Sequence, residues 1–213
     1  ATTEIYTLSL HDALPICTTQ SGSSMSLSFF QKRLKPTPKR KAGLAAIRVD
    51  THAHVLPGLD DGPQLLEQSL ELLQGLSDLG IRQVIATPHI MSGYYPNTIA
   101  HIMAKRLELI EAVSLERIPI VVKVAAEYYV EDAFLKLIEE GQPLLTLGVP
   151  GQQPYLLIES AVNEEPPLLE EVIKSLGSRG IIPLLAHPER NLYLQKHFER
   201  AIELFRMGCL FQV

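Results

Sequence analysis

The stretch VDTHAHVLPGLDDG, residues 49–62, places two histidines two positions apart at the end of an apolar run and follows them with two aspartates. In an extended strand, side chains two positions apart point to the same side, so His52 and His54 can present two imidazoles to one ion. Asp60 and Asp61 can add oxygen ligands, or their carboxylates can interact favourably with the positive, amino-terminal end of a following helix. The stretch therefore predicts either a strand that ends in a metal site or a strand that ends in surface and capping histidines.

From Ile47 onward the same rhythm repeats, because short β-branched runs alternate with helix-like stretches. This alternation is typical of βα units and of a parallel sheet. Strands are predicted at 47–52, 83–87, 120–125, 155–159, 181–186 and 209–213. Helices are predicted at 63–78, 97–115, 131–140, 165–178 and 195–207. Pro63 is expected at the first position of its helix, and Gly80 and Gly180 stand where helices should stop.

Polar residues gather where each predicted strand ends. They are His52 and His54, then His89, Glu127, Glu159, and finally His187 with Arg190. In parallel α/β folds the carboxyl ends of the strands lie at one edge, where the loops converge on a site. The pattern predicts that these side chains share one pocket.

The residue types in this set suit a transition metal. Glu127 and Glu159 follow the apolar runs VVKVAA and YLLI, so a buried carboxylate there has to be paired or bound to a cation. His89 and His187 are either ligands or hydrogen-bonded loop residues. Mixed imidazole and carboxylate ligands favour manganese, iron or zinc, and a bridging carboxylate can hold two such ions. Arg190 can clamp an oxyanion such as phosphate, or it can form a surface salt bridge.

Composition limits the remaining possibilities. With 213 residues and 46% hydrophobic content, the chain can form one α/β domain. No apolar run is long enough for a membrane span and no secretory signal opens the chain, so a cytoplasmic protein is expected. Cys17 and Cys209 form no CxxC motif, and neither is followed by the arginine six positions later that a cysteine-dependent phosphatase requires.

The first 46 residues differ from the rest and are expected to be a leader outside the core domain at 47–213. Residues 1–24 resemble a translated sequencing adaptor, with Met25 as the expected natural start. Residues 25–46 form a basic arm, because the segment 32–41 holds six of the 19 Lys and Arg. That arm is either a handle for an acidic partner or a solvated leader. The remainder is acidic, and no nucleic-acid partner is expected.

The motifs DTHAHVLPGLDDGP, IATPHI, AAEYY, LIES and AHPERN occur in this order between Asp50 and Asn191, and the match they carry runs from about Val49 to the last residue. Together they resemble the bacterial metal-dependent protein-tyrosine phosphatases of the polymerase-and-histidinol-phosphatase (PHP) superfamily, a branch linked to capsule and exopolysaccharide synthesis. The resemblance implies an α/β fold, a distorted (β/α)7 barrel of which about six strands are present here. It also implies two to three divalent ions, usually manganese, with iron or zinc as alternatives.

By this resemblance, seven residues fall on metal-ligand positions: His52, His54, Asp61, His89, Glu127, Glu159 and His187. Arg190 falls on a phosphate-contacting position, so His187 and Arg190 are the expected catalytic residues. The implied reaction is attack on phosphotyrosine by a metal-activated hydroxide. The implied substrate is a protein, the tyrosine-rich tail of a membrane kinase that controls polysaccharide chain length, and oligomerisation is left open.

The sequence departs from the family at one place. The family continues with another strand and a late Asp-x-His ligand pair, whereas this chain stops at GCLFQV, so truncation at the carboxyl end is expected. Two alternative functions therefore stay open. One is a phosphoesterase for a small phosphomonoester such as histidinol phosphate, and the other is a non-catalytic binding module.

Overall fold

The computed structural model describes residues 47–149 and 151–213, so the leader and its basic arm lie outside the described residues. The strands are β1 (Val49–Ala53), β2 (Gln83–Ala86), β3 (His89–Ile90), β4 (Val121–Val124), β5 (Glu127–Tyr129), β6 (Tyr155–Glu159), β7 (Ile182–Ala186) and β8 (Leu210–Gln212). The helices are α1 (Leu66–Asp78), α2 (Ile99–Leu115), α3 (Asp132–Glu139), α4 (Leu169–Ser178), α5 (Leu192–Lys196) and α6 (Phe198–Arg206), with a 3₁₀ turn η3 (Pro188–Arg190).

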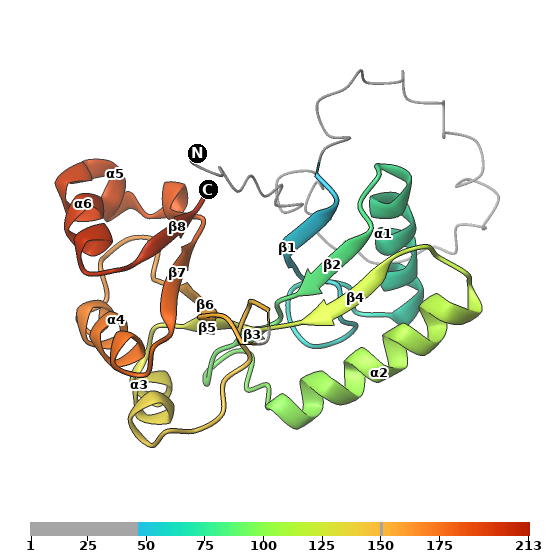
Figure 1. Cartoon of the computed structure of the whole chain (residues 1–213), viewed down its shortest axis with the longest axis horizontal. Coiled ribbons are helices and arrows are strands. Elements are labelled where there is room, and N and C mark those ends of the chain that lie inside the picture. Colours follow the sequence, from blue (N-terminus) through green and yellow to red (C-terminus); the bar gives the residue numbers. More distant parts are fainter. Residues whose placement is uncertain (1–46, 150) are drawn as a thin grey trace, which may run out of the picture.

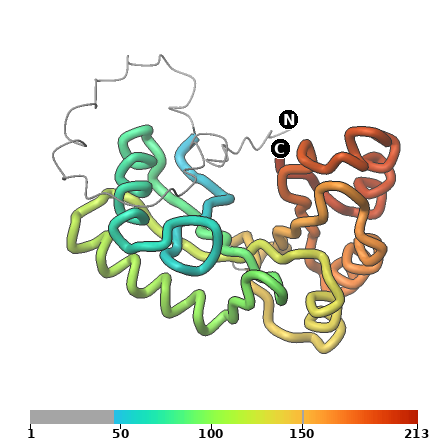
Figure 2. Tube along the Cα trace, turned by 180° about the vertical axis from the view of Figure 1, so that it is seen from behind, coloured from blue at the N-terminus to red at the C-terminus, as the bar shows by residue number. Residues whose placement is uncertain are grey.

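All pairings between these strands are parallel, which confirms the predicted α/β class. The strands form two sheets, ordered β1-β2-β4 and β3-β5-β6-β7-β8. The helices lie on the outer side of an arc of strands, with β1 and β8 at its two ends (Figures 1 and 2). Strands that follow one another around an arc in chain order are typical of a β/α barrel. The specific seven-stranded barrel stays a prediction.

The expectation of about six strands was wrong in one respect, because two of them are interrupted. Pro88 separates β2 from β3, since proline has no N–H to donate to a ladder. A second break at Ala125 and Ala126 separates β4 from β5. Hydrogen bonds nevertheless cross both breaks, from Ala125 N to the Ala86 carbonyl (2.9 Å) and from Glu127 N to the Pro88 carbonyl (3.1 Å). Each interrupted strand therefore still acts as one arm that leads to the site.

Three helix predictions also need correction, and the first is that the helix expected at 165–178 begins at Leu169. Helix α1 begins at Leu66 rather than at Pro63, because the Gln68 side chain accepts hydrogen bonds from the backbone N–H groups of Gln64 and Leu65 and so satisfies the helix start there. The single helix expected at 195–207 is two, since His197 leaves the helical region (φ −132°, ψ 74°) between α5 and α6. Within the described residues, no helix combines the length and apolar character that a bilayer crossing requires.

The apolar core lies between the strands and the helices outside them. Helix α1 contributes Leu73 and Leu76, and α4 contributes Leu176 at the same depth. These side chains pack with Val84 of β2 and Leu156 of β6 in one continuous cluster that spans both sheets. A close-packed interior of this kind transmits strain, so it holds the strand ends at fixed positions.

Two glycines, one after a helix and one inside a helix, test the helix assignments. Gly180 follows α4 with φ +70°, a conformation that favours glycine, so Gly180→Ala is expected to lower the free energy of unfolding by about 1 kcal/mol or more. Gly75 lies inside α1, where an added Cβ would meet nothing within 4 Å, so Gly75→Ala is expected to raise it by about 0.5–1 kcal/mol. Urea denaturation of both variants measures the two changes, and a stabilised Gly180→Ala variant would contradict this account.

Candidate metal centre

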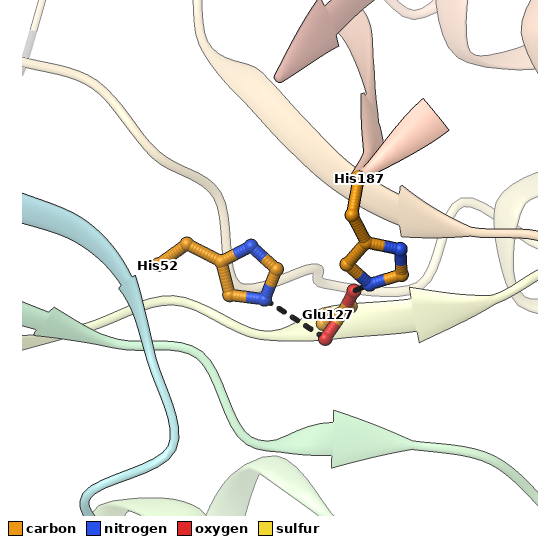
Figure 3. A group of neighbouring side chains, drawn as sticks. All are labelled: His52, Glu127 and His187. Atoms are coloured by element: carbon orange, nitrogen blue, oxygen red, sulfur yellow. Dashed lines mark hydrogen bonds and ion pairs between the residues drawn. The ribbon is translucent and has the colours of Figure 1, made fainter. Parts of the chain in front are cut away.

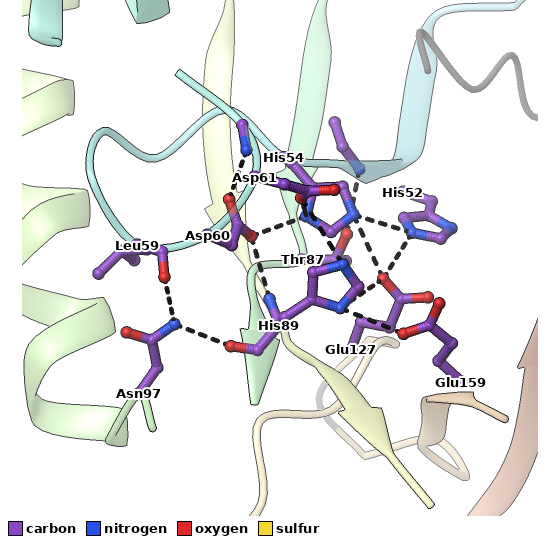
Figure 4. A network of polar contacts seen from close by, with 12 residues as sticks. His52, His54, Leu59, Asp60, Asp61, Thr87, His89, Asn97, Glu127 and Glu159 are labelled. Carbon is purple, nitrogen blue, oxygen red and sulfur yellow. Dashed lines mark hydrogen bonds and ion pairs between the residues drawn. The ribbon is translucent and has the colours of Figure 1, made fainter. Parts of the chain in front are cut away.

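A fully buried carboxylate lies at the centre of the candidate site. Glu127 opens β5, and its side chain has no exposed surface. Its Oε2 lies 3.1 Å from His52 Nε2, 3.2 Å from His54 Nε2 and 3.3 Å from His89 Nδ1, while its Oε1 lies 3.2 Å from His187 Nε2. Figures 3 and 4 show these imidazoles pointing at the carboxylate. Such a buried charge is tolerated only where cationic or hydrogen-bonding groups compensate it.

The four histidines reach Glu127 from the carboxyl ends of three different strand arms. His52 and His54 lie on and just after β1, His89 opens β3, and His187 follows β7. His187 has φ +32° and ψ 55°, a left-handed conformation that is uncommon for residues other than glycine. Backbone outliers of this kind cluster at functional sites, where the surrounding structure holds them in place.

The structure brings all seven sequence-predicted ligands together in three overlapping groups. They are His52 with Glu127 and His187, His54 with Asp61 and His89, and His89 with Glu127 and Glu159. In each group, one ligand atom per residue lies within 4.8 Å of the others. Because Glu127 and His89 each belong to two groups, the geometry suits a cluster of neighbouring ions rather than one isolated ion.

Asp60 contacts the histidines in a way that the sequence did not reveal. Its Oδ2 lies 2.7 Å from His54 Nδ1 and accepts the backbone N–H of His89 at 3.1 Å, and its Oδ1 accepts the backbone N–H of Gly62 at 3.0 Å. A carboxylate on the far nitrogen of a histidine fixes the tautomer and the ring orientation, which leaves Nε2 to face Glu127. Asp60 therefore positions His54, and Asp61 is the aspartate that joins a ligand group.

Two further residues hold His89. The Asn97 amide donates to the carbonyl oxygens of Leu59 and His89, both at 2.8 Å, so it ties the loop after β1 to β3 (Figure 4). The ring of Tyr95 stacks on His89 with centroids 5.4 Å apart and an interplanar angle of 13°. Neither residue was identified from the sequence, because no spacing rule relates them to His89.

Burial and charge shift the protonation of this cluster. Burial lowers the pKa of His54, but its hydrogen bonds to Asp60 and Glu127 outweigh burial and raise the pKa to about 10. Burial raises the pKa of Glu127, but its contacts with His187, His52 and His54 prevail, and the pKa lies well below its usual range. Burial and then the Glu127 charge raise the pKa of Glu159 to about 7. The raised pKa of His54 thus places a positive charge 3.2 Å from Glu127 Oε2.

The residues fit divalent metal ions. Among the described residues, Glu127 Oε1 accepts no hydrogen bond of good geometry, although His187 Nε2 lies 3.2 Å away, and His187 Nδ1 is likewise buried without a hydrogen bond. An acceptor oxygen that is buried and unsatisfied costs free energy unless a cation reaches it. Imidazole and carboxylate donors together suit manganese, iron or zinc.

Arg190 belongs to none of the three groups. It ends η3, half-buried, and its backbone N–H donates to the His187 carbonyl at 2.9 Å. Its backbone is therefore held next to His187.

Gly62 tests the loop that carries Asp60. A Cβ at Gly62 would lie 2.6 Å from the His54 carbonyl oxygen and 3.0 Å from Asp60 Oδ1, so Gly62→Ala must displace the loop from His54. We expect it to lower the free energy of unfolding by about 1–3 kcal/mol. Gly93→Ala is the matched control, because an added Cβ there meets nothing within 4 Å. Equal urea midpoints for Gly62→Ala and the unsubstituted chain would overturn this prediction.

Comparison with known proteins places these residues in a family context. Residues 48–213 match the model of the family described as "Capsular polysaccharide synthesis, CpsB/CapC". CapC of Staphylococcus aureus is 30% identical over 165 residues, and the tyrosine-protein phosphatase YwqE of Bacillus subtilis is 31% identical over 165 residues; each match covers 78% of this chain and 63% of the relative. The tyrosine-protein phosphatase CpsB of Streptococcus pneumoniae is 30% identical over 166 residues, covering 78% of this chain and 66% of that protein.

A solved structure supports the same relationship. The crystal structures of YwqE from B. subtilis and CpsB from S. pneumoniae, described as unique metal-dependent tyrosine phosphatases, include a chain that superposes with a TM-score of 0.68 at 30% identity. The match covers 78% of this chain and 65% of that one. The present chain thus spans a little under two thirds of the length of the relatives that it matches.

Proposed function

Since this chain belongs to the CpsB/CapC family of capsular polysaccharide synthesis proteins, we propose that it is a metal-dependent phosphatase that hydrolyses phosphotyrosine on a protein. The observation that carries the proposal is the fully buried Glu127 carboxylate, which four imidazoles approach within 3.3 Å. Such a cluster is built for cations, and the relatives YwqE and CpsB are described as metal-dependent tyrosine phosphatases.

The proposed ligands are the seven residues of the three groups, His52, His54, Asp61, His89, Glu127, Glu159 and His187. Two to three divalent ions would bind there, and manganese is the expected metal. They would lower the pKa of a bound water to supply a nucleophile, and they would screen the phosphate charge. The side chains of the protein arrange the ligands. Glu127 holds the histidines around its carboxylate, and Asp60 fixes the orientation of the His54 ring, with Oδ2 at 2.7 Å from Nδ1.

Arg190 is the proposed phosphate clamp. Its guanidinium is planar and always charged, so it can donate two parallel hydrogen bonds to phosphate oxygens. Its backbone is fixed next to His187, which places both proposed catalytic residues on the same turn, η3 and its cap. The leaving phenolate of tyrosine has a pKa near 10, so it needs less help from an acid than a serine alkoxide would.

A cysteine nucleophile is a poor alternative within the described residues. Cys209 is completely buried, and burial raises the pKa of its thiol to about 12. Because the thiolate is the nucleophilic form, a thiol with this pKa is inert at neutral pH.

The proposal extends to the substrate and the setting. The substrate would be the tyrosine-rich tail of a membrane kinase that controls polysaccharide chain length, acted on in the cytoplasm. The family's description, capsular polysaccharide synthesis, supports a role in this setting. A phosphotyrosine peptide with several tyrosines is the matching probe, and histidinol phosphate is the competing small substrate.

Substitution of the central ligands tests the metal centre. Glu127→Ala and His54→Ala are each expected to reduce manganese-dependent turnover of a phosphotyrosine peptide at least about 100-fold, because each removes a group that holds an ion. Metal content, measured by mass spectrometry after dialysis, should fall in parallel. Glu140→Ala is the matched control, because Glu140 is exposed and pairs with Lys136 of α3, away from the three ligand groups. Near-normal turnover in either ligand variant would show that the ligand set is wrong.

The same preparations separate the two alternatives. Faster turnover of histidinol phosphate than of the phosphotyrosine peptide would favour a small-molecule phosphoesterase. Fewer than two bound ions per chain and no turnover, combined with retained binding of the peptide, would favour a non-catalytic binding module.

A further inference from the structure

Strand β8 (Leu210–Gln212) places a polar side chain deep in the fold. Gln212 is 3% exposed, although it lies in an otherwise apolar strand. A buried glutamine has to satisfy both an acceptor oxygen and a donor NH₂ group, since leaving either unpaired costs free energy. Its partners therefore show what the residue is for.

Both partners of Gln212 lie on β1, a strand of the other sheet. The side-chain oxygen Oε1 lies 2.7 Å from His52 Nδ1, and Nε2 donates to Thr51 Oγ1 at 3.2 Å. The backbone of Gln212 pairs in register with Ala186, the residue immediately before His187. A single residue thus connects the strand that carries His52 with the strand that leads to His187.

These contacts bear on one ligand group in particular. His52 and His187 belong to the same group with Glu127, and their rings are stacked with centroids 5.8 Å apart (Figure 3). A ligand histidine must present a lone pair to the ion, and the hydrogen bond at its other nitrogen decides which nitrogen carries the proton. With Gln212 Oε1 as the acceptor, Nδ1 carries a proton, and Nε2 is the ring nitrogen that faces Glu127 and is left to bind an ion.

The opposite orientation of the amide would have the opposite effect. If the NH₂ group faced His52, Nδ1 would accept and Nε2 would carry the proton, so Nε2 could not bind an ion. In the structure Oε1 faces the ring, 2.7 Å from Nδ1, and Nε2 donates to Thr51 Oγ1.

From these contacts we infer that Gln212 is a positioning residue for the metal centre. It holds His52 in the Nδ1–H tautomer, and it fixes β1, which carries His52, relative to β7, which leads to His187. The inference rests on the proposed metal centre. Gln212 orients His52 as Asp60 orients His54, with a neutral amide in place of a carboxylate.

Metal binding by the chain tests the inference without any activity assay. Titration with Zn²⁺ should show that Gln212→Leu, which keeps the size but loses the acceptor, weakens one bound ion by about 10–100-fold. Gln212→Glu keeps an acceptor oxygen that faces Nδ1 and should retain Zn²⁺ affinity within about threefold, because the hydrogen bond that orients His52 is preserved and the added buried charge lowers the free energy of unfolding instead. Gln74→Leu is the matched control, because Gln74 is exposed on α1 and its side chain donates to Asp78.

The tautomer itself gives a second readout, which stays valid if Gln212→Leu folds poorly. In the Zn²⁺-loaded chain, ¹⁵N NMR of the histidine side chains should show a protonated Nδ1 and a metal-bound Nε2 for His52. A protonated Nε2, or equal Zn²⁺ affinity for Gln212→Leu and the unsubstituted chain, would overturn the role assigned to Gln212. If the unsubstituted chain binds no Zn²⁺ at all, the proposed metal centre fails instead.

Discussion

The buried carboxylate of Glu127 is the constraint on which the site depends. A negative charge with no exposed surface is stable only if positive or donor groups surround it closely. Four histidines do so here, all within 3.3 Å. Because each histidine comes from a strand end, this one charge also fixes where those strand ends must lie. The chemistry of the centre and the arrangement of the strands are therefore two aspects of the same requirement.

The parallel topology explains how distant residues meet. His52 and His187 are separated by most of the described chain, yet His52 lies near the carboxyl end of β1 and His187 directly follows β7, and both strands pair with parallel neighbours. Parallel strands deliver their carboxyl ends to one edge, so each βα unit adds one or two side chains to the same place. The interrupted arms do the same: the break before β3 and the break before β5 place His89 and Glu127 in register with one another.

Much of this could be predicted from the sequence, and the failures have physical causes. The strand ends marked by His52, Glu127 and Glu159 were predictable. An apolar run indicates a strand, and the polar residue that ends the run indicates the strand's carboxyl end. The role of Asp60 was not predictable, since a carboxylate six residues from His54 gives no signal that it bonds to Nδ1. Gln212 lies 160 residues from His52, and only the folded structure brings the two together. Long-range contacts of this kind have no local pattern.

The two histidines of the opening motif are supported by different means, and charge gives a reason. His54 is held by the Asp60 carboxylate, whereas His52 is held by the neutral amide of Gln212. The centre already contains the carboxylates of Glu127, Glu159 and Asp61 beside Asp60. A further carboxylate at position 212 would add negative charge that the buried site must compensate, and buried charge is costly unless it is fully paired. A neutral acceptor orients the ring of His52 without that cost. The negative charge of the carboxylates then stays small enough for a few divalent ions to balance.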